Sequence, residues 1–132
     1  MKGYQGKIEK LTLENENFRR VLYTAKSSQL VLMSLQPTEE IGEEIHKTSD
    51  QFFRFEQGEG KVIIEGNEFA VINGDAVMVP AGSKHNVINT STTESLKLYT
   101  LYCPPHHRDG IVHATKEQAE GDNEEFDGKT TE

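Results

Sequence analysis

Four side chains in the middle of the sequence have the types and the spacing of a divalent-metal site. Glu44 and His46 are two residues apart, so in an extended strand they project from the same face. Gln51 follows across a turn at residues 48–50, and His85 arrives from a third extended segment. Two imidazoles, one carboxylate and one amide oxygen suit a transition ion better than calcium, which prefers oxygen alone. The sequence therefore predicts one divalent transition metal (Mn, Fe, Ni or Zn) held by these four residues.

Each of the four residues also has a simpler interpretation. Glu44 lies in an acidic run that can face solvent, and His46 and His85 can be hydrogen-bonded core histidines. Gln51 can support His46 without touching a metal. If the imidazoles are ligands they must be neutral, so metal binding is expected to weaken at low pH.

The walls of a pocket for a small-molecule ligand follow from the same alternation. Side chains that share a strand face with Gln51 or His85 are expected to point into the same space. Asn89 has a second interpretation, because its amide can instead support a turn. The predicted pocket residues are Phe53, Phe55, Val87, Asn89 and Tyr102.

Short extended segments must position these residues. Such segments recur between turn signals, and no 3.6-residue apolar period appears before residue 114. This arrangement is typical of an all-β barrel or sandwich. The predicted strands cover residues 18–24, 29–35, 41–47, 51–56, 61–65, 68–72, 76–79, 85–89 and 96–102.

One stretch carries a specific family pattern. It reads Gly74, five residues, Pro80-x-Gly82, two residues, His85, three residues and Asn89. This pattern resembles the second motif of the cupin family and matches it at every fixed position. The resemblance implies a cupin double-stranded β-helix, a jelly-roll barrel, in a small bacterial protein that forms a homodimer.

The region around His46 resembles the first cupin motif with departures. His46 stands at the second histidine of the motif, Gly58 closes it, and Gln51 replaces its glutamate. Glu44 replaces the first histidine, and Thr38 replaces the opening glycine. The resemblance thus implies that the metal site is rearranged rather than lost. Some similar small cupins are labelled mannose-6-phosphate-isomerase-like.

Several functions are open to such a barrel. A bound metal can polarise a carbonyl or hydroxyl, bind an enediolate or activate oxygen, which suits an isomerase, a dioxygenase or a lyase. The alternatives are a non-catalytic ligand-binding protein and a structural homodimer. No catalytic base can be named, and the scarcity of cations near the motifs disfavours a sugar-phosphate substrate.

The two ends of the sequence predict structures other than barrel strands. We expect an N-terminal arm over residues 1–17, ambiguous between helix and strand, and the barrel over 18–103. An extension over 104–120 should contain a short helix capped by Thr115, and the acidic composition of 121–132 is typical of disorder. His106, His107 and His113 in this region could form a second metal site, but a lid over the barrel mouth is the favoured interpretation.

The composition excludes several classes of partner. The net charge is −8, of which −5 falls in residues 115–132, and there is no basic patch for nucleic acid or an anionic membrane. Cys103 is the single cysteine, so no internal disulfide can form. With no apolar leader and no membrane-spanning run, the sequence predicts a cytoplasmic protein.

Overall fold

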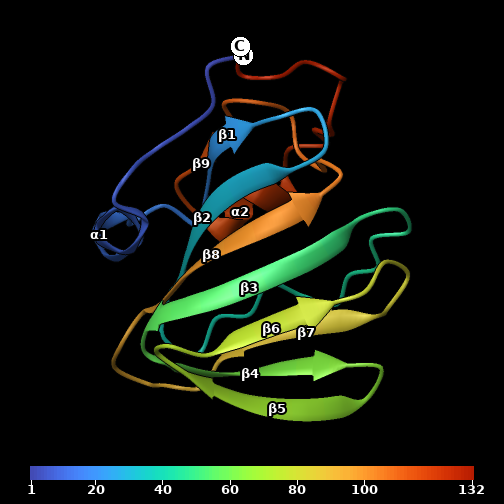
Figure 1. Cartoon of the computed structure of the whole chain (residues 1–132). Helices are drawn as coiled ribbons and strands as arrows, with labels where there is room; N and C mark the ends of the chain where they lie inside the picture. The colour runs from blue at the N-terminus through green and yellow to red at the C-terminus, as the bar shows by residue number, and fades with distance from the viewer.

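The computed structural model describes all residues from 1 to 132, as nine strands and two helices. The strands form a six-stranded sheet in the order β6-β3-β8-β2-β1-β9 and a three-stranded sheet in the order β5-β4-β7 (Figure 1). Every strand pairing is antiparallel. The all-β class with a short C-terminal helix is therefore confirmed. The elements are α1 (Ile8–Glu14), β1 (Arg19–Thr24), β2 (Gln29–Leu35), β3 (Asp50–Gln57), β4 (Glu59–Ile64), β5 (Asn67–Ile72), β6 (Ala76–Val79), β7 (His85–Asn89), β8 (Leu96–Cys103), β9 (Val112–His113) and α2 (Lys116–Glu120).

Alternate side chains along the strands point into the barrel interior. On β3, Gln51, Phe53 and Phe55 are buried, while the residues between them are partly exposed. The register places Gln51 opposite Tyr102 of β8 on one side and Val79 of β6 on the other. Fifteen buried apolar side chains form one core, and each fully buried aromatic ring contributes about 2–3 kcal/mol through burial.

The segment expected as a strand over 41–47 is not a strand. It contains only an isolated bridge between Glu44 and His85, preceded by another at Glu40. The reason is local: Gly42 takes a φ of +108°, and its N–H bonds the Asn86 side chain instead of a neighbouring backbone. The bridge still sets Glu44 directly opposite His85, because each residue's N–H donates to the other's carbonyl at 2.9 and 3.0 Å.

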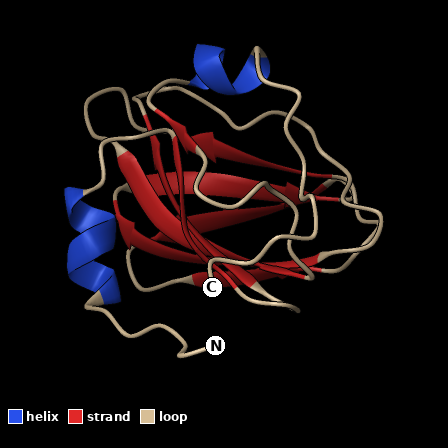
Figure 2. Cartoon of the chain, turned by 90° about the horizontal axis from the view of Figure 1, so that it is seen from above, coloured by secondary structure: helices blue, strands red, loops and turns tan.

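The helices lie outside the sheets (Figure 2). The ambiguous arm forms α1, and buried Lys97 of β8 holds the end of this helix. The Lys97 ammonium donates to the Leu13 carbonyl at 2.7 Å and to Glu16 at 2.8 Å. The predicted cap of α2 is also present, since the Thr115 hydroxyl accepts from the Gln118 N–H. Neither helix is long and apolar enough to cross a membrane.

The acidic tail lies against the barrel in the structure, although its composition resembles that of disordered segments. The Thr131 N–H donates to the Thr24 carbonyl at 3.0 Å. The Glu132 carboxylate accepts from the Lys2 N–H at 2.7 Å, and the two termini lie side by side (Figures 1 and 2). Backbone hydrogen bonds and carboxylate acceptors, rather than apolar burial, make these contacts.

Gly58 closes the first motif at a position that tolerates no side chain. Its φ is +93°, and an added Cβ would come within 2.7 Å of the Ser95 carbonyl oxygen. We expect Gly58→Ala to lower the free energy of unfolding by at least about 2 kcal/mol, since strain and a backbone clash combine. Gly66 is the matched control: its φ is +82° but nothing lies within 4 Å, so Gly66→Ala should cost about 1 kcal/mol. Equal losses in urea unfolding would show that the close approach to Ser95 has no effect.

Candidate metal centre

The structure brings the four predicted ligands to one place between the two sheets. Gln51 comes from β3 of the larger sheet, and His85 comes from β7 of the smaller one. Glu44 and His46 lie on the segment that connects β2 to β3. The ligand atoms of Glu44, His46 and His85 all lie within 4.8 Å of one another, and both histidines are buried.

The side chains of His85 and Gln51 face each other, and each presents a lone pair to the other. The His85 Nδ1 lies 2.9 Å from the Ser83 carbonyl oxygen, which can only accept, so Nδ1 carries the proton of the neutral ring. The Nε2 atom then presents a lone pair, and it lies 3.2 Å from the Gln51 Oε1. The Gln51 amide nitrogen is occupied, because it donates to the Thr100 hydroxyl at 3.0 Å. A cation held between these two acceptors would satisfy both lone pairs.

The second pair of ligands shows a related feature. The His46 Nε2 is buried and has no hydrogen-bond partner. It lies 3.0 Å from the Glu44 Oε2, but the angles are not those of a hydrogen bond. A ring nitrogen and a carboxylate oxygen this close, without a hydrogen bond, are well placed to share a cation.

Electrostatics keep the site in the protonation states that a metal needs. Burial lowers the pKa of His85 below its ordinary value, with a smaller contribution from the neighbouring His46. Burial would raise the pKa of Glu44, but the hydrogen-bonding capacity and charge of His46, helped by Arg19 and His85, outweigh it and hold that pKa below its ordinary value. Near neutral pH the site therefore offers neutral His85 and ionised Glu44.

The donor set fits a transition metal. Two imidazole nitrogens, one carboxylate and one amide oxygen converge, and the His46 Nε2 among them is buried without a hydrogen-bond partner. Glu44, His46, Gln51 and His85 would hold the ion, with the Ser83 carbonyl fixing the tautomer of His85 and Thr100 orienting Gln51.

The predicted pocket residues divide into two groups. Phe53 and Tyr102 line the site, with ring centres 6.3 Å from His85 and 5.5 Å from His46. Phe55 and Val87 are part of the apolar core, with Phe55 stacked behind Phe53. Asn89 lies at the other end of β7, where its amide donates to three backbone carbonyls. Asn89 thus plays the supporting role that the sequence left open.

The three histidines after the barrel have three different sets of partners. The His106 ring packs against His46, with centres 4.2 Å apart. The His107 Nδ1 bonds Glu124 at 2.6 Å while its Nε2 bonds the Tyr102 hydroxyl at 3.2 Å. His113 bonds Asp122. The one group of three potential metal ligands in the chain is Glu44, His46 and His85, so the C-terminal histidines form no second site.

His106 gives the metal-free protein a measurable pH dependence. Burial, with His107 and His46, lowers the pKa of His106 from 6.5 to about 4. Its stabilising contribution is complete above pH 6.5 and is lost as the pH falls toward 4, because the unfolded chain binds the proton more readily. The expected loss is about 2 kcal/mol once solvent screening is allowed for. His106→Phe keeps the packed ring and should flatten the profile of unfolding free energy against pH; parallel profiles would contradict this.

Two features of the site were not found from the sequence. Arg19 is buried on β1, and its charge is one of those that lower the pKa of Glu44. Glu124, in the acidic tail, holds His107 and also accepts from the Arg108 N–H at 2.8 Å. The inward position of Arg19 could have been predicted from the alternation with Val21, whereas nothing local marks Glu124.

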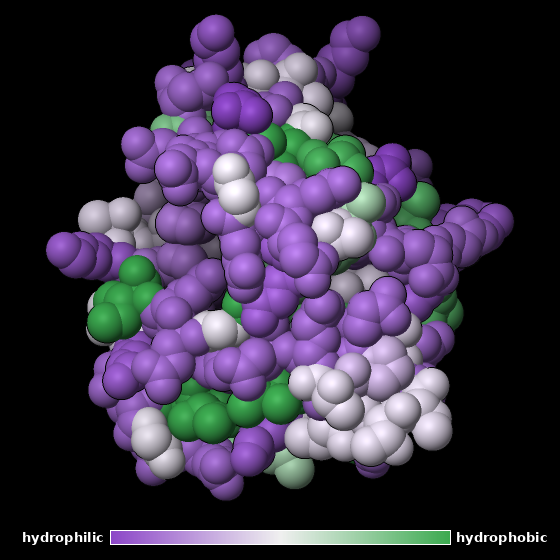
Figure 3. Space-filling model, turned by 180° about the vertical axis from the view of Figure 1, so that it is seen from behind, coloured by the Kyte–Doolittle hydropathy of each residue, from purple (hydrophilic) through white to green (hydrophobic).

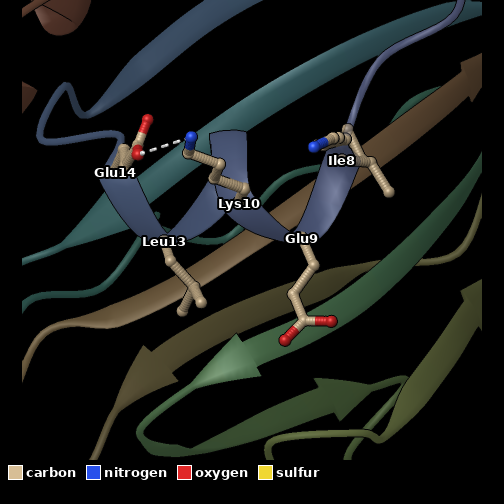
Figure 4. Close-up of a pocket in the computed structure, with 6 residues that line it drawn as sticks. Ile8, Glu9, Lys10, Leu13 and Glu14 are labelled. Atoms are coloured by element: carbon tan, nitrogen blue, oxygen red, sulfur yellow. Dashed lines mark ion pairs between the residues drawn. The ribbon is translucent and has the colours of Figure 1, made fainter.

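A surface hollow beside α1 is not connected with this chemistry. It measures about 590 Å³ and lies beside α1, where its only ion pair joins Lys10 and Glu14 at 3.9 Å (Figure 4). Both side chains are exposed, so such a pair contributes little. The hollow contains none of the metal-site residues; it is lined by Lys7, Ile8, Glu9, Lys10, Leu13 and Glu14.

Comparisons with known proteins agree with the geometry. The family model described as "Cupin domain" matches residues 31–102, which include all four predicted ligands. The protein YrkC of Bacillus subtilis is 47% identical over 118 residues, covering 85% of this chain. This chain spans only 63% of the length of YrkC. The protein L612 of Acanthamoeba polyphaga mimivirus is 39% identical over 121 residues, covering 89% of this chain and 76% of L612.

A solved structure is similar over nearly the whole fold. The crystal structure of BH2720 from Bacillus halodurans superposes with a TM-score of 0.88 at 42% sequence identity. The match covers 90% of this chain and 94% of BH2720. The arm and the C-terminal extension therefore belong largely to a shared architecture, because the barrel from β1 to β8 alone would account for a smaller share of the chain.

Proposed function

Because this chain belongs to the cupin family, we propose that it binds one divalent transition metal in the barrel and uses it on a small oxygenated organic molecule. Glu44, His46, Gln51 and His85 are the proposed ligands. One observation carries the proposal: the Gln51 Oε1 and the His85 Nε2 lie 3.2 Å apart with no proton between them, and a shared cation explains this contact.

The proposed substrate meets the metal beside an aromatic wall. A bound divalent ion would polarise a carbonyl or hydroxyl oxygen of the substrate. Phe53 and Tyr102 would exclude water on one side, since both side chains are almost fully buried beside the ligand histidines. The Tyr102 hydroxyl stays neutral, because burial raises its pKa far above the ordinary value, and it bonds the His107 Nε2 at 3.2 Å.

His106 is the proposed proton acceptor of an isomerase-type reaction. Its ring touches His46 and is neutral near pH 7, because burial lowers its pKa to about 4. Neither of its ring nitrogens makes a hydrogen bond, in contrast to those of His107. A sugar phosphate remains disfavoured, because two of the few cations near the motifs are already paired, Lys84 with Glu43 and Arg54 with Glu56.

A non-catalytic, ligand-binding or structural homodimer is the second candidate. One observation favours it: the C-terminal extension covers the site, with His106 packed on His46 and His107 held by Glu124. The face seen from behind is mainly hydrophilic, with apolar patches between polar side chains (Figure 3). Phe69, Ile72 and Met78 on the outer strands are exposed and would suit a contact between two copies.

Metal analysis tests the proposal directly. Protein purified without chelator is expected to contain close to one equivalent of Mn, Fe, Ni or Zn, and adding the same ion to chelated protein should raise Tm. The absence of both effects would overturn the proposal. Oxygen uptake with small diols, or proton exchange into a small carbonyl substrate, would then separate a dioxygenase from an isomerase. Sedimentation of the purified protein distinguishes a homodimer from a monomer.

A further inference from the structure

A short segment after β8, the strap (residues 104–108), covers one side of the metal centre. The His106 ring of the strap packs on the His46 ring, with centres 4.2 Å apart. His46 and His85 are only 7% and 4% exposed, whereas the Glu44 side chain keeps 33% of its exposure. The strap therefore closes the route to the centre on the His46 side, and its movement would uncover that ring.

The barrel holds the backbone of the strap from the inside. The Gln29 amide oxygen accepts from the N–H groups of His106 and His107 at 3.2 and 2.9 Å, and its amide nitrogen donates to the His107 carbonyl at 2.8 Å. The Ser49 hydroxyl donates to the Pro104 carbonyl at 2.8 Å. These bonds fix the backbone but provide no partner for the His107 Nδ1.

The acidic tail holds the strap from the outside. The Glu124 carboxylate lies 2.6 Å from the His107 Nδ1 and accepts from the Arg108 N–H at 2.8 Å. The Phe126 N–H donates to the His106 carbonyl at 3.0 Å. The side chains of Glu124 and His107 are only 3% and 7% exposed. The strap thus lies between the barrel and the tail, with a buried hydrogen bond on the tail side.

The closed position of the strap depends on the bond between His107 and Glu124. The Nε2 of the neutral His107 ring accepts from the Tyr102 hydroxyl at 3.2 Å, so the Nδ1 carries the proton and donates to Glu124. A buried N–H without an acceptor is costly, while the same group in water is satisfied. Loss of Glu124 would therefore favour positions of the strap in which the His107 ring reaches solvent.

The tail is the part of this contact that can open while the barrel stays folded. No residue from 121 to 132 belongs to the apolar core, and the one large apolar side chain of this stretch, Phe126, is partly exposed. Segments with few buried apolar contacts open locally more readily than core strands do. Gln29, on the other side of the strap, is 1% exposed and lies on β2, which is buried along most of its length.

We propose that Glu124 is a latch that holds the strap over the metal centre, so that release of the tail controls how fast a divalent ion exchanges with the site. The inference rests on the proposed function and specifies how that site is opened. Removal of the latch opens a route without altering a metal ligand. The rates of metal uptake and release should therefore rise together, and their ratio, which is the affinity, should stay the same.

Zinc exchange tests the latch. Zinc-loaded protein is mixed with an excess of a chromogenic chelator, and metal-free protein is mixed with zinc, both by stopped flow. Glu124→Ala is expected to raise both rates about tenfold and to keep the dissociation constant within about threefold of the wild-type value, because only the closed strap loses a bond. Glu125→Ala removes the same charge from the exposed neighbouring residue and should leave both rates unchanged.

Two results of this experiment would overturn the inference. Wild-type rates in Glu124→Ala would show that zinc exchanges past the partly exposed Glu44 and that the strap is no barrier. A faster release without a faster uptake would show that the change weakens the site itself. If Glu124→Ala does not fold, Glu124→Gln decides, because it keeps the shape and one acceptor: both rates should rise by a smaller factor, and wild-type rates would overturn the inference.

Hydrogen exchange separates the latch from the proposed function. The N–H groups of His106 and His107 donate to Gln29, which the Glu124 variants leave unchanged, so faster exchange at these two positions reports movement of the strap itself. The amides of β3 and β8 should keep their wild-type protection. If no zinc binds but the strap amides of Glu124→Ala exchange faster, the metal proposal fails and the latch stands. If zinc binds while the strap amides and both zinc rates are unchanged, the latch fails alone.

Discussion

His85→Ala is expected to lower the affinity for manganese or zinc by more than about 100-fold, because loss of a supporting residue alone typically weakens metal binding about 10–100-fold. The barrel should remain folded. The backbone bonds of His85 to Glu44 are unchanged by the substitution, and the lost ring contacts near Phe53 should cost only about 1–2 kcal/mol. Competition with a chelator measures the affinity, and the double variant His46→Ala, His85→Ala should bind no metal.

His113→Ala provides the matched control. His113 is buried to the same degree as His85, with both at 4% exposure, but its ring bonds Asp122 and Arg19 instead of facing a cation site. The control should keep wild-type affinity for the metal. If the His46 and His85 variants retain a full equivalent of metal, the bound ion lies elsewhere in the chain and the assignment of the centre is wrong.

The position of His85 was predictable because its causes are local. Gly74 and Gly82 have φ values of +93° and +84°, so the turns before β6 and β7 need glycine where the sequence has it. Pro80 ends β6 after Val79, and the alternation from His85 then fixes which way the imidazole points. The same local reasoning predicted β3 and the inward direction of Gln51.

The path of the chain around Glu44 was less predictable. Alternation correctly placed Glu44 and His46 near each other, but it also predicted a regular strand over 41–47. The strand is broken by a side chain from elsewhere, since Asn86 accepts the Gly42 N–H. Such long-range bonds leave no periodic signal in the segment that receives them.

The covering of the site depends on contacts between distant parts of the sequence. His106 reaches His46 across 60 positions, and Glu124 fixes His107 from the acidic tail. The composition of residues 121–132 predicts disorder because it contains few apolar side chains. The composition does not reveal that the Glu124 carboxylate accepts from the His107 ring and from the Arg108 N–H together. These two bonds lower the pKa of Glu124 to about 2 despite partial burial.

Gln51→Glu is expected to raise the affinity for metal and to lower the stability of the metal-free protein. Glutamate is the residue that the first motif usually has here, and a carboxylate is a stronger donor than an amide, so affinity should rise at least tenfold, or about 1.4 kcal/mol. Without metal the new carboxylate would be buried at a position only 2% exposed, in the same site as Glu44. The metal-free protein should therefore lose about 2–4 kcal/mol of unfolding free energy.

Gln29→Glu separates the metal effect from the general penalty of a buried acid. Gln29 is 1% exposed, and its amide bonds Thr24 and the backbone of His107, away from the ligands. Its replacement should destabilise the protein with or without metal and leave the affinity unchanged. Chelator competition and urea unfolding with and without metal measure both quantities for both variants. If the Gln51 amide instead donates its N–H to His85 Nε2, no cation is needed between them, and Gln51→Glu would destabilise the protein without any gain in affinity. A gain confined to Gln51→Glu requires the lone pairs of residue 51 and His85 to meet on a metal.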